Sequence, residues 1–376
     1  MTIQEDRTAA TVDGAGSDPT TEALHDSSLR WDVPTPTTTV FDWDYTNGRD
    51  HLLRLYDKGT RKQWVSSDRI DWDHEIDPMN PLGVPDDVIP IADAPIWQRL
   101  SEEQKGEVRH HMVAWQFSQF MHGEQGALVC SSKIVNTVPQ IDSKFYAATQ
   151  VVDEARHVET YSRFLHEKVK LTYPLNPNLK VLLDQGLSDS RWDFTYLAMQ
   201  VLIEGLALAA FGTIRMLATD PLAKAVNTYV MQDEARHVMF GRLALRDYYP
   251  ELTDAERDER EEFVVEACYR MRDRFLAEEL WERLGLPASE TLEHVKTSET
   301  QIMFRGLLFQ RIVPVLRDIG LFGDKVRAAF TDMGVMGYQD TDVEELMAED
   351  EAMAEELDRQ RAEAHVEGVA AAGDQA

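Results

Sequence analysis

The feature that most constrains this chain is a pentapeptide written twice at a fixed distance. Asp-Glu-Ala-Arg-His occupies residues 153–157 and recurs at residues 233–237. Each copy follows another glutamate, thirty residues before the glutamate of the motif. The resulting pairs are Glu124 with Glu154 and Glu204 with Glu234. A repeat of this kind predicts two similar halves that contribute the same set of side chains.

The spacing has a geometric meaning if both halves are helical. Pro139 lies midway through the first interval, and Asp220-Pro221 lies near the middle of the second. Each arm then holds about 15 residues, or about 22 Å of α-helix, so the returning carboxylate comes level with the departing one. Within each Glu-x-x-His motif, the two side chains share one helix face. Four helices would therefore present four carboxylates and two imidazoles at one height.

This arrangement is typical of di-iron and di-manganese sites in helical bundles. Four buried carboxylates would repel one another, and a pair of divalent cations removes that repulsion. Oxygen-rich ligation favours iron or manganese over zinc or copper. Cys130 and Cys268 are the two cysteines of the chain, which excludes a cysteine zinc cluster. The predicted metal ligands are Glu124, Glu154, His157, Glu204, Glu234 and His237.

The residues around each motif histidine are expected to support the ligands. Asp153 and Asp233 each precede the histidine of their own motif by one helical turn. A ligating imidazole usually donates its other N–H to a carboxylate, so these aspartates are the expected partners. Arg156 and Arg236 are expected to pair with such carboxylates across the bundle.

Residues 101–332 favour an all-α fold, a four-helix bundle with flanking helices, because strand signals are almost absent. Asp220-Pro221 is a helix start. Capping boxes are predicted at Ser101 with Gln104, Thr253 with Glu256 and Thr341 with Glu344. Long apolar-periodic stretches fill residues 101–137, 140–170, 188–218, 221–247, 254–284 and 298–318.

The remaining segments differ in composition from this helical region. Residues 1–33 are poor in aliphatic side chains and are predicted to be a disordered tail. Residues 34–100 carry several tryptophans and are expected to wrap the bundle, with one helix at about 49–64. Residues 333–376 form an acidic tail, which is interpreted either as a docking arm for a partner or as a solubilising tail.

The net charge of the chain restricts the kinds of partner that it is expected to bind. Lys and Arg number 38 against 67 Asp and Glu, which gives a net charge of −29. Such a surface repels phosphate backbones and anionic lipid, so neither nucleic acid nor a membrane is an expected partner. The first residues lack the apolar core of a signal peptide, and no uninterrupted apolar run of about 20 residues is apparent. A cytoplasmic location is expected.

The doubled motif resembles the ferritin-like di-iron carboxylate superfamily. It is most similar to the bacterial multicomponent monooxygenase hydroxylases, with ribonucleotide reductase small subunits and fatty-acyl desaturases as relatives. The resemblance covers residues of about 100–250. It implies a non-haem di-iron oxygenase that activates O2 with two iron ions per chain, or with a Mn/Fe pair. It also implies an external electron donor, such as a ferredoxin or a flavin reductase, and a homodimer.

The resemblance further implies roles for individual residues. Glu154 and Glu234 would bridge or chelate the metals, Glu124 and Glu204 would be more terminal, and each histidine would hold one iron. The substrate would be a small apolar or aromatic molecule that is hydroxylated, N-oxygenated or desaturated. The residues expected to line its pocket are Ala127, Ile203, Leu208 and Phe211.

Two other functions remain open at this stage. Tyr161 lies four residues after His157, where reductase small subunits keep a radical tyrosine, so a radical-generating subunit is one alternative. A ferroxidase or iron-handling protein is the other. Leu208 stands where the monooxygenases carry a threonine, and Val230 stands where the arylamine N-oxygenases carry a third histidine.

Overall fold

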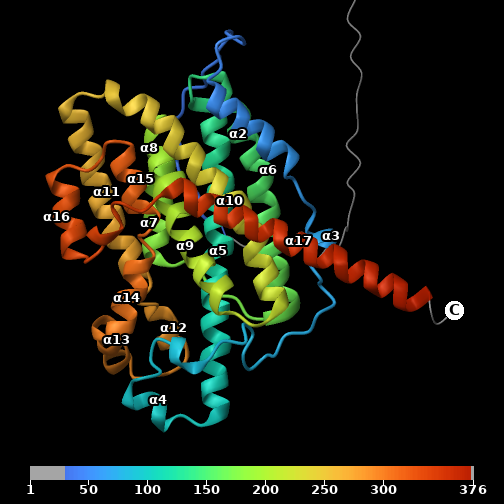
Figure 1. Ribbon diagram of the computed structural model, residues 1–376. Coiled ribbons are helices and arrows are strands. Elements are labelled where there is room, and N and C mark those ends of the chain that lie inside the picture. Colours follow the sequence, from blue (N-terminus) through green and yellow to red (C-terminus); the bar gives the residue numbers. More distant parts are fainter. Residues whose placement is uncertain (1–29, 374–376) are drawn as a thin grey trace, which may run out of the picture. The chain divides into compact units, whose positions relative to one another are not determined.

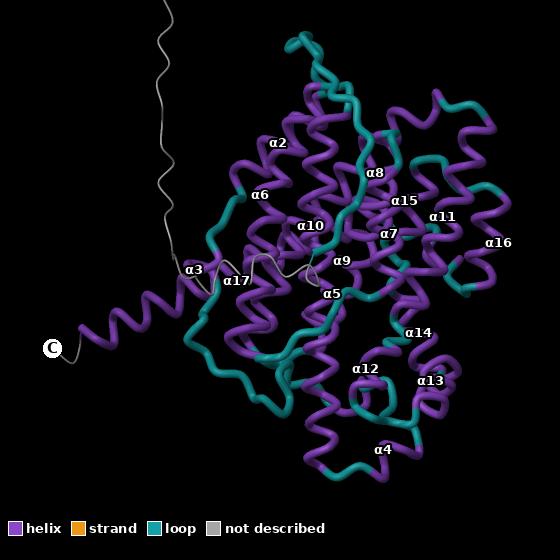
Figure 2. Tube along the Cα trace, turned by 180° about the vertical axis from the view of Figure 1, so that it is seen from behind, coloured by secondary structure: helices purple, strands orange, loops and turns teal. Residues whose placement is uncertain are grey.

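The computed structural model describes residues 30–373 of the chain. Within these residues the protein is helical and contains no strand (Figures 1 and 2). The predicted disordered tail at 1–33 falls almost wholly outside the described residues. The chain divides into two units between Pro34 and Thr35. Every helix described below belongs to the second unit.

Two helix hairpins form the core, as the repeat predicts. The first hairpin is α5 (Glu102–Thr137) with α6 (Ile141–Arg163). The second is α9 (Glu204–Leu217) with α10 (Pro221–Tyr248). The partners of each hairpin pack along one another, and α6 also contacts α10. The all-α, ferritin-like bundle expected from the sequence is therefore confirmed.

Local sequence signals set most helix ends. The capping boxes at Ser101 and Thr253 form as predicted. The side chain of Asp220 accepts a hydrogen bond from the backbone N–H of Ala223, with Pro221 at the first helical position. The prediction at Thr341 is wrong by one residue. The carboxylate of Asp342 instead accepts hydrogen bonds from the backbone at the start of the last helix, because an aspartate accepts from N2 and N3 as readily as a threonine does.

Two predicted continuous helices are broken. The stretch 254–284 divides into α11 (Asp254–Arg274) and α12 (Glu278–Arg283), since Ala277 adopts a left-handed conformation with φ of 51°. The stretch 298–318 divides into α14 (Glu299–Leu307) and α15 (Ile312–Asp318). Within residues 101–332, three helices lie between the predicted apolar-periodic stretches or after the last of them: α7 (Pro177–Ser188), α13 (Ala288–Thr297) and α16 (Asp324–Asp332). Short 3₁₀ turns lie at Asp86–Val88, Tyr249–Glu251 and Met336–Tyr338.

The helix that contains α9 is irregular before the site. It starts as α8 (Trp192–Tyr196) and continues through a π-helical segment, η4 (Leu197–Ile203), which ends directly before Glu204. A second π-helical segment, η3 (Phe164–Val169), ends α6. Such wide turns occur mostly at functional sites. By length and composition the stretch Trp192–Leu217 could cross a membrane, which the sequence analysis did not anticipate, but 83% of its apolar window is buried in the bundle.

The segment before the bundle contributes short helices: α2 (Asp50–Arg61), α3 (Ser66–Arg69) and α4 (Pro95–Arg99). The predicted helix at 49–64 is α2, with Arg49 as its N-cap. Helix α2 packs against α6 and α10, and the neighbouring Trp64 and Trp72 are buried. The wrapping segment thus reaches the two helices that carry the Glu-x-x-His motifs.

The acidic tail forms a helix, α17 (Val343–Gly373), which crosses α10 in Figure 1. Its acidic side chains pair with Lys58, Lys62 and Arg69 of the wrapping segment. Asp350 is buried between Arg215 and Arg311. The first turns of this acidic segment therefore dock on the bundle of their own chain.

Candidate metal centre

All six predicted ligands lie together inside the core, and every one is buried. Helix α5 supplies one glutamate, the first residue of α9 supplies another, and α6 and α10 each supply a Glu-x-x-His pair. The side chains form two groups in which the candidate ligand atoms lie within 4.8 Å of one another. One group comprises Glu124, Glu154, His157 and Glu234, and the other comprises Glu154, Glu204 and His237.

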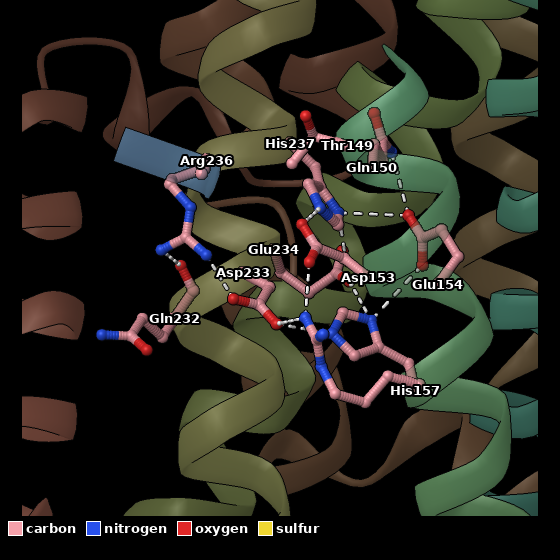
Figure 3. A network of polar contacts seen from close by, with 12 residues as sticks. Thr149, Gln150, Asp153, Glu154, His157, Gln232, Asp233, Glu234, Arg236 and His237 are labelled. Atoms are coloured by element: carbon pink, nitrogen blue, oxygen red, sulfur yellow. Dashed lines mark hydrogen bonds and ion pairs between the residues drawn. The ribbon is translucent and has the colours of Figure 1, made fainter. Parts of the chain in front are cut away.

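The two imidazoles present the same nitrogen to the glutamates (Figure 3). His157 Nδ1 lies 3.0 Å from Glu234 Oε1 and 3.3 Å from Glu154 Oε2. His237 Nδ1 lies 3.1 Å from Glu154 Oε1 and 3.4 Å from Glu234 Oε1. The two motif glutamates are therefore each close to both imidazoles. That is the position from which a carboxylate can bridge two metal ions.

The polar atoms of this cluster fit a pair of cations. Four of them are buried and make no well-aligned hydrogen bond, although three lie within 3.3 Å of an imidazole or carboxylate of the cluster: Glu154 Oε2, Glu204 Oε2, Glu234 Oε1 and His237 Nδ1. A buried polar atom without a partner costs free energy, and buried charges are normally paired or bound to metal. Glutamate oxygens with one imidazole nitrogen per metal suit iron or manganese. The residues present thus match a di-metal site.

Electrostatics lead to the same conclusion. Burial, together with the charge of Glu234, raises the pKa of Glu124 and of Glu204 well above the usual value. Burial acts in the same direction on Glu154, but His237 and His157 hold the pKa of Glu154 below its usual range. The glutamates of this cluster cannot all carry charge side by side unless positive charge lies between them.

The predicted aspartates do contact the imidazoles, but in a crossed pattern. His157 Nε2 lies 3.1 Å from Asp233 Oδ2, and His237 Nε2 lies 3.3 Å from Asp153 Oδ2. Each aspartate thus contacts the histidine of the opposite motif and not the one that follows it in its own helix. With Nδ1 facing the glutamates, Nε2 points toward the opposite helix and meets the aspartate there. Each imidazole is therefore oriented by the other half of the repeat.

Arginines and the wrapping segment hold these aspartates in place. Arg156 donates to Asp233 Oδ2 over 2.9 Å and also pairs with Asp153, while Arg236 pairs with Asp233. Trp64 Nε1 donates to Asp233 Oδ2 over 2.7 Å, and Gln63 Nε2 donates to Asp153 Oδ1 over 2.7 Å. Sequence reasoning missed the tryptophan and the glutamine, because both lie outside the repeat.

The residue one turn before the motif glutamate differs between α6 and α10. Gln150 Nε2 donates to Glu154 Oε1 over 2.9 Å (Figure 3). It also donates to Glu204 Oε1 over 2.7 Å, which links the two halves. Val230, one turn before Glu234, is fully buried and apolar. Gln150 was not predicted from the sequence, although it lies one helical turn before Glu154 and therefore on the same face of α6.

A narrow cavity of about 20 Å³, here called the inner cavity, reaches the cluster. Three of the four predicted pocket residues line it: Ala127, Ile203 and Phe211. Leu208 does not line this cavity, because it is about 100° around α9 from Ala207, which does. The other lining residues are Gln119, Phe120, Gly123, Glu124, Met199, Glu204, Ala207, Glu234 and Arg274.

Tyr161 lies one turn after His157 in α6, as the sequence predicts. Its ring packs against the rings of Phe117, Phe120 and Phe211, with centroids 5.7, 5.7 and 5.8 Å away. Its hydroxyl is buried and has no hydrogen-bond partner. Burial raises the pKa of Tyr161 well above its usual value, and Glu124 and Glu234 add to this effect.

Comparison with known proteins gives one family and several similar structures. The family model for P-aminobenzoate N-oxygenase AurF matches residues 46–320. A Synechococcus protein with aldehyde deformylating oxidase activity shares 15% identity at a TM-score of 0.43, covering 58% of this chain and 94% of its own. A mutant R2-like ligand-binding oxidase with an anaerobically reconstituted Mn/Fe cofactor shares 17% identity at a TM-score of 0.47, covering 75% of this chain and 96% of its own. No curated protein matches the chain significantly.

Proposed function

This chain belongs to the P-aminobenzoate N-oxygenase AurF family, and we propose that it oxidises a small organic substrate with O2 at the buried glutamate–histidine cluster. Membership makes it a non-haem di-iron oxidoreductase of the ferritin-like superfamily. The observation that carries the proposal is the cluster itself. Six buried side chains from four helices converge there, and four of their polar atoms make no hydrogen bond.

The proposed ligand assignment follows from these distances. His157 and His237 would each hold one metal ion through Nδ1. Glu154 and Glu234, each close to both imidazoles, would be shared by the two ions. Glu124, which is 3.3 Å from His157 Nδ1, would hold the first ion. Glu204, grouped with His237, would hold the second. Val230 is apolar, so this position adds no third imidazole.

When bound, the iron pair supplies electrons to O2 and the oxidising power for the substrate. The protein fixes the geometry around it. Asp233 and Asp153 hold the two imidazoles in one tautomer, with Nδ1 free to bind metal. The aromatic and aliphatic walls of the inner cavity exclude water from the reacting groups. Gln150 donates to Glu154 and Glu204 and so restrains the carboxylates that must stay beside the metals.

The proposed substrate is a small apolar or aromatic molecule, because the inner cavity is lined largely by Phe120, Met199, Ile203 and Phe211. Hydroxylation, N-oxygenation and desaturation are all compatible with this lining, and the family makes an arylamine the first compound to test. Iron-loaded protein with a chemical reductant should consume O2 faster with 4-aminobenzoate or another arylamine than without it. Oxygen uptake that no organic compound accelerates, with steady accumulation of ferric iron, would instead indicate a ferroxidase.

Tyr161 supports a second candidate, a radical-generating subunit. Its hydroxyl is buried without a partner, and its pKa responds to two cluster glutamates. A tyrosyl radical should then appear by electron paramagnetic resonance after the reduced protein meets O2. The signal should be absent in Tyr161→Phe. An oxygenase should keep its substrate oxidation in the same variant.

The electron donor and the assembly state are also proposals. By resemblance to the superfamily, the electrons come from a ferredoxin or a flavin reductase. A homodimer is supported by large apolar side chains exposed on α5 and α6, namely Val129, Phe145 and Val152. Light scattering should give twice the chain mass, and Val152→Glu should lower that mass if α6 lies in the interface. A wild-type protein that stays monomeric at micromolar concentration would refute the dimer.

A further inference from the structure

A row of basic side chains lies on the wrapping segment, although the chain as a whole is strongly acidic. Residues 49–69 contain six Lys and Arg against three Asp, whereas the whole chain has a net charge of −29. Three of these basic residues, which we call the basic strip, lie under α17: Lys58, Lys62 and Arg69. Their side chains are still 33–45% exposed. The strip is therefore a positively charged surface that one helix of the same chain covers in part.

The partners of the basic strip share one face of α17. Each cation forms an ion pair with one acid: Lys58 with Glu351, Lys62 with Glu355 and Arg69 with Asp358. The three acids are separated by four and then three residues, so they lie along one side of the helix over about 10 Å. Figures 1 and 2 show α17 passing α3, the helix that ends at Arg69. An acidic surface of another protein would meet the strip in the same way.

The two parts of α17 are held differently. Asp350 is buried between Arg215 and Arg311 and anchors the first part. In the distal part, residues 351–360, Ala354 is the one buried residue, and the ion pairs to the basic strip are partly exposed. Exposed ion pairs stabilise little and are weakened by salt. Because a segment with few buried side chains opens at low cost, the distal part can leave the strip while Asp350 keeps the helix attached.

The basic strip adjoins the side chains that orient the two imidazoles. Gln63 and Trp64 come directly after Lys62, and their side chains donate to the two aspartates that contact the imidazoles. Arg69 lies over the ring of Tyr229, 5.8 Å from its centroid. That ring packs against Trp64, with centroids 5.4 Å apart. A protein docked on the strip would therefore approach the metal centre from the side of these aspartates.

The net charge of the chain restricts where an acidic protein can bind. A surface with this charge repels it, whereas the basic strip attracts carboxylates, as the acids of α17 show. The metal centre proposed above needs electrons from a separate protein, so the inference rests on the proposed function. We infer that the basic strip is the docking site of an acidic electron-donor protein. The distal part of α17 covers this site as an internal substitute for the donor, and it leaves the strip when the donor binds.

Calorimetric titration with an acidic plant-type ferredoxin tests the docking site. The probe is added to full-length, iron-loaded protein, and its affinity is measured at low and at high salt. The released variant, Glu351→Gln/Glu355→Gln/Asp358→Asn, should bind the ferredoxin at least about tenfold more tightly than wild type at low salt, and high salt should remove most of the difference. The matched control loses three acids that form exposed ion pairs on α11: Asp258→Asn/Glu259→Gln/Glu262→Gln. It should bind as wild type does, because the basic strip stays covered.

A charge-reversed strip, Lys58→Glu/Lys62→Glu/Arg69→Glu, separates docking on the strip from general effects of charge. It repels the distal part of α17 and the ferredoxin alike, so it should not bind the probe at either salt concentration. The substituted side chains form partly exposed pairs, so every variant should fold, which circular dichroism checks. Binding of the charge-reversed strip as tight as that of the released variant would overturn the inference.

Hydrogen exchange shows whether the donor displaces α17. With saturating ferredoxin, wild-type protein should exchange more slowly at residues 50–69 and faster at residues 351–360 than it does alone. Slower exchange at residues 50–69 with no change at residues 351–360 would contradict the displacement. A released variant that binds no more tightly than the matched control would contradict it as well.

Iron content and oxygen uptake distinguish this failure from a failure of the proposed function. If the inference fails in protein that holds about two iron ions and consumes O2 with a chemical reductant, the proposed function stands. Protein that binds no iron would refute the proposed function, while the same titration and exchange measurements still report whether an acidic protein replaces α17 on the basic strip.

Discussion

Asp350 in α17 allows the docking of the acidic helix to be tested by one substitution. Its side chain is 1% exposed, accepts a hydrogen bond from Arg215 Nη2 over 3.1 Å and forms an ion pair with Arg311 Nη2 at 2.8 Å. Burial raises the pKa of Asp350 more than Arg311 and Arg215 lower it, so the cost of burying the carboxylate opposes the attraction of the two arginines. Asp350→Ala should nevertheless be costly, because it leaves the guanidiniums of Arg215 and Arg311 without the carboxylate that pairs with them. Removing one member of a buried ion pair costs about 3–5 kcal/mol.

The matched control is Glu355→Gln in the same helix. Glu355 pairs with Lys62 over 2.7 Å, but its side chain is 63% exposed, and exposed pairs contribute no more than about 1 kcal/mol. Urea unfolding followed by circular dichroism should show a loss for Asp350→Ala at least threefold larger than for Glu355→Gln, and α17 should become sensitive to limited proteolysis. Equal losses in the two variants would refute the reasoning, because burial would then not decide the strength of the pair.

Three further outcomes are expected. Burial tends to raise the pKa of Asp142, but hydrogen bonds from Arg49 hold it below its usual value. The resulting stabilisation of the fold is present above the unfolded-state pKa and is lost as pH falls through the folded-state pKa. Asp142→Asn should therefore lower the free energy of unfolding by about 1–3 kcal/mol at pH 7 and by progressively less in acid. A Cβ on Gly126 would meet Leu183 Cδ2 at 2.3 Å, whereas one on Gly123 meets nothing within 4 Å, so in urea unfolding Gly126→Ala should lose about 1–3 kcal/mol and Gly123→Ala should be neutral or stabilising. Asp233→Asn should weaken iron binding roughly 10–100-fold, and its effect should be additive with His237→Ala but not with His157→Ala; the reverse pattern in iron titrations would exclude the crossed pairing.

The cluster could be predicted from the sequence because the residues that form it recur at equal spacing. Equal spacing of Glu124 to Glu154 and of Glu204 to Glu234, with a turn in the middle of each interval, determines which side chains come level. No comparable pattern relates Trp64 or Gln63 to the aspartates they contact. Those contacts depend on how the wrapping segment lies on α6 and α10, which local sequence does not specify.

The same limit applies to the cavity residues. Phe211, seven residues after Glu204, lines the inner cavity, but Leu208, one turn after Glu204, does not, so helical spacing from a predicted ligand did not decide which side chains reach the cavity. Arg274 could not be found this way. The stretch 254–284 carries helix-forming residues throughout, and the break at Ala277 has no local signal. Tertiary packing decides where α11 ends, and hence that its last arginine reaches a cavity formed by α5 and α9.

The central claim is that the two Glu-x-x-His motifs and their upstream glutamates hold a pair of iron ions. The most direct measurement is the metal content of protein loaded with ferrous iron without O2, desalted and analysed by mass spectrometry. Wild type should hold about two iron ions per chain. His157→Ala and His237→Ala should each hold clearly fewer, since each removes the only imidazole ligand of one ion. Full iron content in both variants would contradict the account.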